Sequence, residues 1–337
     1  MRTIFWVFTV SFLGMLSCEK PEKLFPQPMV SKGLQTQTFK MGETYENQLW
    51  YSFTTQQIRT NQYGLWHIGF SCNNAPRIII NGGLNVNFSI AKFGNCSFKS
   101  VNHDSLRKAN WQFDNPSGEI DSLAFGRCFK PMGFGKFEIV DQIFILDLGA
   151  KIVDSMRYIK LQLLGLSGGY YGFGYSYLND TAIRFKKTLA INPQMNFVYY
   201  NFIDHKEVYD EPFSNNNWDI VFTTYKKFVP DPNGVPFPYI IRGVLINPQK
   251  VEVAEINDIP FNTIDLNFAQ KVIFSKKKDE IGYDWKQYEP VSDRYTMVPN
   301  RVYLIREAGV IIKLRFVDFY NDQGKKGYPK IAWEYLQ

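Results

Sequence analysis

The side chains that most often carry catalysis or bind metals are few in this chain. It has 3 histidines and 4 cysteines among 337 residues. His67, His103 and His205 lie far apart in the sequence, and no two of them have a spacing suited to binding one ion. The short motifs of serine hydrolases, zinc proteases and phosphate-binding loops are also missing from the sequence. We therefore predict no enzymatic activity and expect surface or structural histidines.

Cys18 is the residue best placed for a covalent modification. The preceding stretch from Ile4 to Leu16 is nearly all apolar. This core of about 13 residues is too short to cross a bilayer as a helix of about 20 residues, but it suits the core of a secretion signal. It ends in Met15-Leu16-Ser17-Cys18, which resembles the cleavage box of bacterial lipoproteins. We predict a signal peptide over residues 1–18, lipidation of Cys18, and membrane attachment through this lipid alone.

The other cysteines are Cys72, Cys96 and Cys128. An extracytoplasmic location would permit one disulfide among them and leave one thiol over, and the sequence leaves the pairing open. No two of the three have the spacing of zinc ligands. We expect ordinary buried or singly bridged residues.

The charge distribution gives no sign of a nucleic-acid partner. The chain has 38 Lys and Arg against 32 Asp and Glu, a formal net charge of +6. The basic residues are spread along the sequence. The run Lys276-Lys277-Lys278 is followed at once by Asp279-Glu280, which indicates a solvated turn. We therefore expect no nucleic-acid binding surface.

The composition favours an all-β protein with antiparallel sheets and little helix. Aromatic residues make up 17% of the chain, and sheets accept aromatic and β-branched residues readily. Short alternating apolar runs are separated by glycines and prolines. Residues 261–268 and 281–285 are the best places for a short helix or irregular structure. Residues 19–37 contain three prolines, several charges and few periodic apolar residues, which is typical of a flexible tether.

One short sequence occurs twice and divides the chain. Trp66-His67-Ile68-Gly69-Phe70 is repeated about 150 residues later as Trp218-Asp219-Ile220-Val221-Phe222. In the second copy Trp218, Ile220 and Phe222 alternate, so we expect a half-buried strand with these three side chains in the core. Strand order and approximate spacing agree at six places. We predict two tandem domains, residues 38–191 and residues 192–337.

The second copy resembles a known family. It carries four short strand sequences: Trp218-Asp219-Ile220-Val221-Phe222, Ile241-Arg242-Gly243, Tyr303-Leu304-Ile305-Arg306 and Lys313-Leu314-Arg315-Phe316. Together with the lipoprotein signal and the closing aromatic strand, they resemble the HmuY-like proteins, which are haem-binding lipoproteins of Bacteroidetes. The resemblance covers nearly all of residues 195–337 and the first copy more loosely. It implies an all-β fold, display on the outer membrane, and capture of haem for a TonB-dependent receptor.

The resemblance also directs the search for iron ligands. Haem binders of the family hold the iron between two axial side chains, which are His in some members and Met in others. Met297 lies in a loop with Tyr295 and near Tyr288, and Met132 lies in the comparable loop of the first copy. We predict Met297 as the haem-iron ligand, flanked by both tyrosines, with Met132 as a further candidate.

A second function remains open alongside haem binding. The same scaffold without an iron site would serve as a surface interaction or carbohydrate-binding module. In that case we expect exposed aromatic residues, such as Trp285, Tyr283 and Tyr288, to contact the partner.

Overall fold

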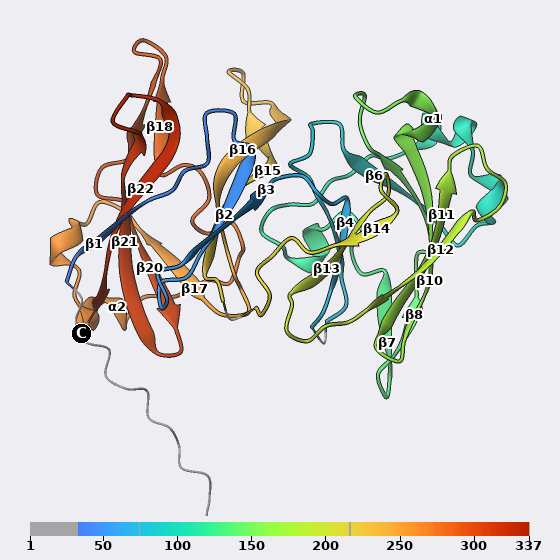
Figure 1. Ribbon diagram of the computed structural model, residues 1–337, viewed down its shortest axis with the longest axis horizontal. Helices are drawn as coiled ribbons and strands as arrows, with labels where there is room; N and C mark the ends of the chain where they lie inside the picture. The colour runs from blue at the N-terminus through green and yellow to red at the C-terminus, as the bar shows by residue number, and fades with distance from the viewer. Residues whose placement is uncertain (1–32, 74, 216, 337) are drawn as a thin grey trace, which may run out of the picture. The chain divides into compact units, whose positions relative to one another are not determined.

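Antiparallel β-sheet dominates the computed structural model, which describes residues 33–336 except 74 and 216 (Figure 1). The all-β prediction is therefore confirmed. The signal peptide, Cys18 and most of the expected tether lie outside the described residues. The last tether residues form part of strand β1, which pairs with the C-terminal strand through Gln35 opposite Trp333.

Two five-stranded sheets have matching strand orders. One runs in the order β12 (Phe185–Ala190), β11 (Tyr170–Tyr177), β10 (Tyr158–Ser167), β9 (Ile143–Asp147) and β6 (Ser89–Gly94). The other runs in the order β1 (Gln35–Thr38), β22 (Lys326–Leu336), β21 (Val310–Tyr320), β20 (Val302–Glu307) and β17 (Glu252–Ile256). Each is built around an antiparallel meander, as the alternating apolar runs predict.

Two four-stranded sheets complete the cores. One contains β14 (Lys206–Val208), β13 (Phe197–Asn201), β4 (Ile68–Ser71) and β5 (Ile78–Ile80). The other contains β16 (Pro236–Ile246), β15 (Ile220–Pro230), β2 (Asn47–Tyr51) and β3 (Ile58–Gln62). The separate hairpins are β7 (Phe129–Gly133) with β8 (Lys136–Ile139), and β18 (Lys286–Glu289) with β19 (Arg294–Met297).

Helical segments are short. They are α1 (Asp154–Arg157), α2 (Leu266–Ala269) and the 3-10 turns Phe98–Ser100, His103–Lys108, Ile120–Ser122 and Phe261–Thr263. The turn at Phe261 and helix α2 fall in the first of the two segments predicted to be short helix or irregular structure, and the second segment, 281–285, is irregular. Asp265 caps α2 by accepting a hydrogen bond from the backbone N–H of Phe268, which explains its start.

Each five-stranded sheet packs against one four-stranded sheet to form a large core. The first core includes Ile68, Phe70, Phe144, Phe173 and Tyr200. The second core includes Tyr51, Phe222, Ile305, Leu314 and Trp333. Apolar side chains from both facing sheets are fully or nearly fully buried in each core, as expected for sheet-on-sheet packing.

The two cores do not follow the expected boundary between residues 191 and 192. Strand β2 pairs with β15, with Tyr51 opposite Ile220, and thereby contributes to the second core. Strand β13 pairs with β4, with Tyr200 opposite Ile68, and contributes to the first core. The N-terminal hairpin of each expected domain is thus exchanged with the other. Sequence similarity marks equivalent strands, but it does not specify which of two equivalent sheets a strand joins.

The repeated Trp-x-Ile-x-Phe sequence differs from the expected strand at its start. Regular pairing begins at Ile68 and at Ile220, after the tryptophan. Ile220 and Phe222 lie in the second core, as predicted. Trp218 does not share their cluster, because it packs with Val221 and with Trp50, 4.6 Å away between ring centroids. The prediction that Trp218 faces the same core is therefore wrong. The backbone is not yet in the strand at this residue, so the period of two does not apply to it.

Candidate functional site

The hairpin β18–β19 carries the sequence-predicted residues Tyr288, Tyr295 and Met297. Tyr288 lies directly opposite Tyr295, and Lys286 lies opposite Met297. Residues opposite each other in an antiparallel pair, and residues two apart along a strand, point to the same side. Lys286, Tyr288, Tyr295 and Met297 therefore share one side of the hairpin, called here the Met297 face. Three of the four predicted site residues are brought together.

The Met297 face runs from the second core out to solvent. Met297 and Tyr295 are partly buried and pack against this core. The Tyr295 ring lies 5.2 Å from Phe319 and 5.3 Å from Tyr288, measured between ring centroids. Tyr288 is 50% exposed, and its hydroxyl donates a 2.6 Å hydrogen bond to Asp293 Oδ1. The face therefore offers an accessible aromatic surface beside a thioether.

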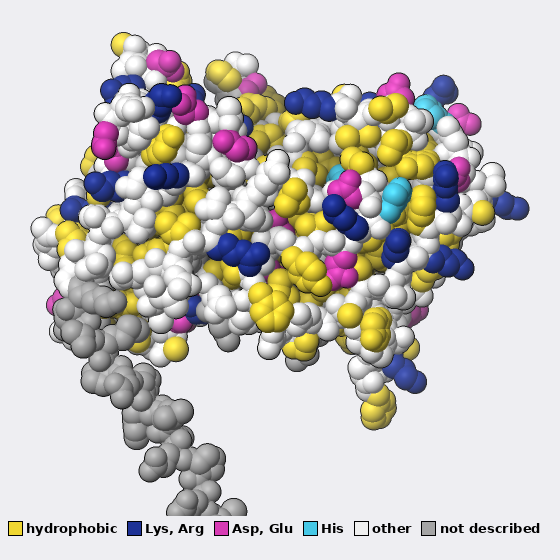
Figure 2. Space-filling view, in the orientation of Figure 1, with side chains coloured by type: hydrophobic (Ala, Val, Ile, Leu, Met, Phe, Trp, Pro, Cys, Tyr) yellow, Lys and Arg dark blue, Asp and Glu magenta, His cyan; other side chains and the backbone are white. Residues whose placement is uncertain are grey.

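Two guanidinium groups lie against tyrosine rings near the hairpin, one against Tyr45 and one against Tyr320. The guanidinium of Arg242 lies 5.0 Å from the ring centroid of Tyr45, and that of Arg294 lies 4.6 Å from the ring of Tyr320. The hydroxyl of Tyr320 accepts a 2.6 Å hydrogen bond from the backbone N–H of Tyr295. Arg294 alternates with Tyr295 along β19, so it lies on the other side of the hairpin, and Arg242 is the cationic group nearest the Met297 face. Figure 2 shows both acidic and basic side chains around this hairpin.

The phenols near Arg242 are protonated at neutral pH. Burial, followed by the neighbouring Tyr295, raises the pKa of Tyr45 to about 12. Burial, followed by Tyr239, raises the pKa of Tyr295 above its ordinary value. Arg242 and Tyr320 act on both phenols. Five residues from four separated segments therefore lie near one another: Tyr45, Tyr239, Arg242, Tyr295 and Tyr320.

Lys286 supports the base of the hairpin. Its ammonium donates a 3.0 Å hydrogen bond to the carbonyl of Arg242 and lies 4.1 Å from the ring centroid of Trp285. Burial lowers the pKa of Lys286 to about 7. The side chain thus ties β18 to β16 and fixes how the Met297 face meets the neighbouring strand.

Met132 is not part of this site. It lies on the hairpin β7–β8 and is 60% exposed, and the nearby Phe129 belongs to the first core. Met297, by contrast, packs against the second core. The two methionines occupy comparable hairpins of separate sheets, so the structure does not bring Met132 to the Met297 face.

The histidines have structural or surface positions. His67 is buried, and its Nδ1 accepts a 3.1 Å hydrogen bond from the backbone N–H of Phe202. Burial lowers the pKa of His67 to about 4, so its ring is neutral at neutral pH. His205 Nδ1 lies 2.7 Å from the hydroxyl of Tyr175, and His103 is exposed. Within residues 33–336, gaps excepted, no three His, Cys, Asp or Glu residues form a metal-binding group.

The structure also shows the state of the three cysteines and the position of Trp285. Cys72, Cys96 and Cys128 are free thiols, of which Cys72 and Cys128 are buried. Trp285, expected as an exposed partner contact, is 2% exposed and stacks on Phe316 with 3.9 Å between ring centroids. That expectation is wrong, because the irregular segment around Trp285 folds back over the second core.

Sequence reasoning missed Arg242, Tyr45 and Tyr320 as neighbours of Met297. They come from strands or loops remote in sequence, and no local pattern relates them to the hairpin. The Ile-Arg-Gly sequence around Arg242 was one available signal, since a charged residue between buried strand residues asks for a specific partner. In the part of the chain that the structure describes, we find no helix with the length and apolar character of a membrane span.

Comparison with known proteins returned solved structures only. No protein-family model and no curated protein matches the chain. It is similar to apo PinO from Porphyromonas gingivitis at 10% identity and TM-score 0.28, covering 90% of this chain and 98% of that one. It is similar to the apo HmuY analog of Tannerella forsythia at 10% identity and TM-score 0.25, covering 91% and 98%. A candidate HmuY-like heme-binding protein from Bacteroides vulgatus follows at 15% identity and TM-score 0.18, covering 40% and 82%.

Two of these structures carry the name HmuY, the name of the family that the sequence resembles. The chemistry of the candidate site follows from the side chains of this chain.

Proposed function

We propose that this chain binds haem or a related tetrapyrrole at the Met297 face and hands it to an outer-membrane receptor. One observation carries the proposal: a thioether and two phenols share one side of a partly exposed hairpin. The receptor class expected from the sequence resemblance is TonB-dependent.

The donor chemistry of the Met297 face fits a haem group. Methionine sulfur and tyrosine oxygen are both known haem-iron ligands, and the bound group would supply a redox-active iron. Aromatic rings provide flat apolar contact for a macrocycle. The guanidinium of Arg242 suits a carboxylate side group, because guanidinium pairs with carboxylate in a planar two-bond geometry.

The exposure of the hairpin suits transient capture. Tyr288 is half exposed, while Met297 is partly sheltered against the second core. A ligand held there would keep one edge accessible, which a receptor needs to take it over. We place the chain outside the cytoplasm, attached to the outer membrane through lipidated Cys18, as its N-terminal sequence predicts.

A haemin titration of the purified full chain tests the binding proposal. We expect a saturable shift of the Soret band relative to free haem, under oxidising and under reducing conditions, because the protein ligates the iron. A titration without a saturable shift in either state would rule out haem as the ligand of this chain.

A further inference from the structure

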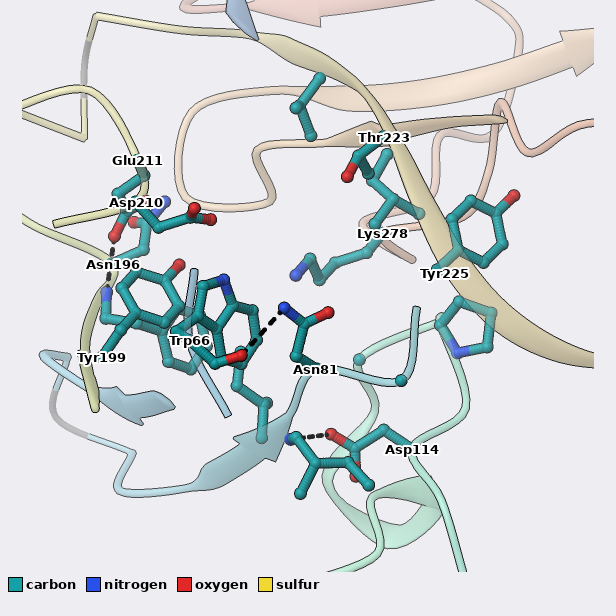
Figure 3. Close-up of a pocket in the computed structure, with 18 of the residues that line it drawn as sticks. Trp66, Asn81, Asp114, Asn196, Tyr199, Asp210, Glu211, Thr223, Tyr225 and Lys278 are labelled. Atoms are coloured by element: carbon teal, nitrogen blue, oxygen red, sulfur yellow. Dashed lines mark hydrogen bonds between the residues drawn. The ribbon is translucent and has the colours of Figure 1, made fainter. Parts of the chain in front are cut away.

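A cavity of about 140 Å³ lies where the two four-stranded sheets approach each other (Figure 3). Strands β2, β5, β13 and β15 contribute to its wall, together with loop residues around Asn81, Asp114, Asp210 and Lys278. The exposed lining residues Asn115 and Gln249 mark where it reaches solvent. The Met297 face does not contribute to this wall.

Two equivalent aromatic pairs line the cavity. The ring centroids of Trp66 and Tyr199 lie 4.6 Å apart, and so do those of Trp50 and Trp218. In each pair, one residue precedes the repeated Ile-x-Phe sequence and the other comes from the exchanged strand. The exchange of hairpins therefore brings one aromatic pair from each four-stranded sheet to the cavity wall.

The lining carries an equal number of acidic and basic side chains. They are Asp114, Asp210 and Glu211, and Arg77, Lys226 and Lys278. Asp210 and Glu211 are 3% and 1% exposed, and Lys226 is 2% exposed. Burial of charge is costly unless partners compensate it. The balance of signs means that a neutral ligand would add no uncompensated charge.

Several of these charges are fully engaged with the protein. Asp210 accepts a 2.7 Å hydrogen bond from Gln48 Nε2. Asp114 accepts 2.7 Å bonds from the backbone N–H groups of Ile80 and Ala124. Lys226 donates a 3.0 Å bond to the carbonyl of Val86. These charged groups therefore stabilise the cavity wall through hydrogen bonds within the protein.

Other polar groups of the wall have no hydrogen-bond partner among the described residues. They are Nε1 of Trp218, Oδ1 of Asn196 and the hydroxyl of Tyr225. Trp218 and Asn196 are 3% and 6% exposed, so bulk solvent does not satisfy them. Figure 3 shows Lys278 extending into the cavity on the side where Asn81 and Asp210 lie. A buried polar atom without a partner is costly, which calls for an occupant with its own donors and acceptors.

We propose that this cavity binds one neutral sugar ring. Hydroxyl groups both donate and accept hydrogen bonds, so they can satisfy the Lys278 and Trp218 donors and the Asn196 acceptor together. The apolar faces of the ring would lie against the tryptophan and tyrosine walls. A cavity of about 150 Å³ holds a six-membered ring such as benzene. A hexose is larger because of its hydroxyl groups, so a single ring whose hydroxyl groups reach the opening is the largest unit that we expect to fit.

Isothermal titration of the purified full chain with glucose, galactose, mannose and N-acetylglucosamine tests this site. We expect at least one sugar to bind saturably. Lys278→Met should weaken that binding about 10- to 100-fold, because a hydrogen bond from a charged donor is lost. Lys277→Met is the matched control from the same lysine run, is exposed, and should leave binding unchanged. Asn115→Trp at the opening should abolish binding by steric closure.

Three results would overturn the assignment. One is the absence of saturable binding with every sugar of the panel, as expected if the cavity holds water only. Another is binding of the zwitterions glycine and serine without binding of any sugar. The third is sugar binding that survives both Lys278→Met and Asn115→Trp. Asn115 is exposed, so its variant decides the question even if Lys278→Met fails to fold. Haemin is not used here, so the outcome is independent of the haem proposal.

Discussion

His67 and Asp219 are different side chains that make the same structural contact in the two copies. His67 Nδ1 accepts the backbone N–H of Phe202 at 3.1 Å, and Asp219 Oδ2 accepts that of Phe53 at 2.6 Å. Phe202 and Phe53 follow the equivalent exchanged strands β13 and β2. Position two of the repeated sequence therefore holds the exchanged strand in place and is not a ligand position.

Asp219 has an additional partner, which makes its replacement more costly. Its Oδ1 lies 2.6 Å from the ammonium of Lys250, and the Lys250 side chain is 9% exposed. We expect Asp219→Ala to lower the free energy of unfolding by about 3–4 kcal/mol, because the Phe53 N–H loses its acceptor and the buried Lys250 keeps only Glu307, 3.2 Å away, as a partner. His67→Ala should cost about 1–3 kcal/mol, for one unsatisfied N–H. Urea unfolding of both variants checks this order, and an equal cost would contradict it.

The buried carboxylates of the cavity predict a pH dependence of stability. Burial raises the pKa of Glu211 to about 7, although the backbone N–H of Phe197 stabilises the charged form. A raised acid pKa favours the protonated folded state, so this contribution to stability is present at low pH. It is lost as the pH rises from about 4 to about 7.

Glu211→Gln provides the measurement for this effect. Glutamine stays neutral, so the unfolding free energy of the variant should fall less between pH 4.5 and pH 7 than that of the unmodified chain. Urea unfolding at a series of pH values gives both curves. Parallel curves for the two proteins would show that Glu211 does not titrate in this window.

Local spacing explains which residues of the site were predictable. Tyr288, Tyr295 and Met297 come together because one short hairpin carries them all. Met132 does not lie near Met297, because its own hairpin belongs to the first core, and the sequence does not show which core a hairpin joins. Lys278 was expected in a solvated turn, yet it lines the cavity. A charged run of three residues carries no information about burial, which depends on the loops packed against it.

At the scale of elements, the exchanged hairpins are the main feature beyond the sequence prediction. The meanders β9–β11 and β20–β22 were predictable from alternation, and the structure contains them. Strand β3 has no alternating apolar pattern, because it is mostly polar and lies at a sheet edge. The matching contacts of His67 and Asp219 support the predicted duplication, while the pairing partners could not be inferred from one sequence.

The exchange makes a prediction about fragments. Residues 64–212 contain every strand of the first core as one contiguous segment, whereas residues 33–191 lack β13 and β14 and carry β2 and β3 without their partner β15. We expect fragment 64–212 to unfold cooperatively and fragment 33–191 not to do so. Thermal melts followed by near-UV circular dichroism compare the two.

A mixture of fragments 33–191 and 192–337 serves as the control. We expect the two to associate and to regain a cooperative transition, because each supplies the hairpin that the other lacks. Independent cooperative folding of each fragment as a monomer would contradict the exchanged arrangement.

At the scale of the whole molecule, the two proposed sites lie on different parts of the same fold. The Met297 face is a hairpin that extends from the second core, while the cavity lies at the junction between the two cores. The Met297 face combines a soft sulfur ligand with aromatic rings, and the cavity combines balanced charges with tryptophan walls. Ligands of different size and chemistry are therefore expected to bind without direct competition.

The central proposal is that Met297 would hold the iron of a bound haem. The most direct test is a haemin titration of the unmodified chain, Met297→Ala and Met132→Ala, followed by the Soret band of the reduced protein. We expect Met297→Ala to shift the band and weaken binding at least about tenfold through loss of the ligand and its packing, and Met132→Ala to match the unmodified chain. Unchanged spectra and affinity in Met297→Ala would contradict the account.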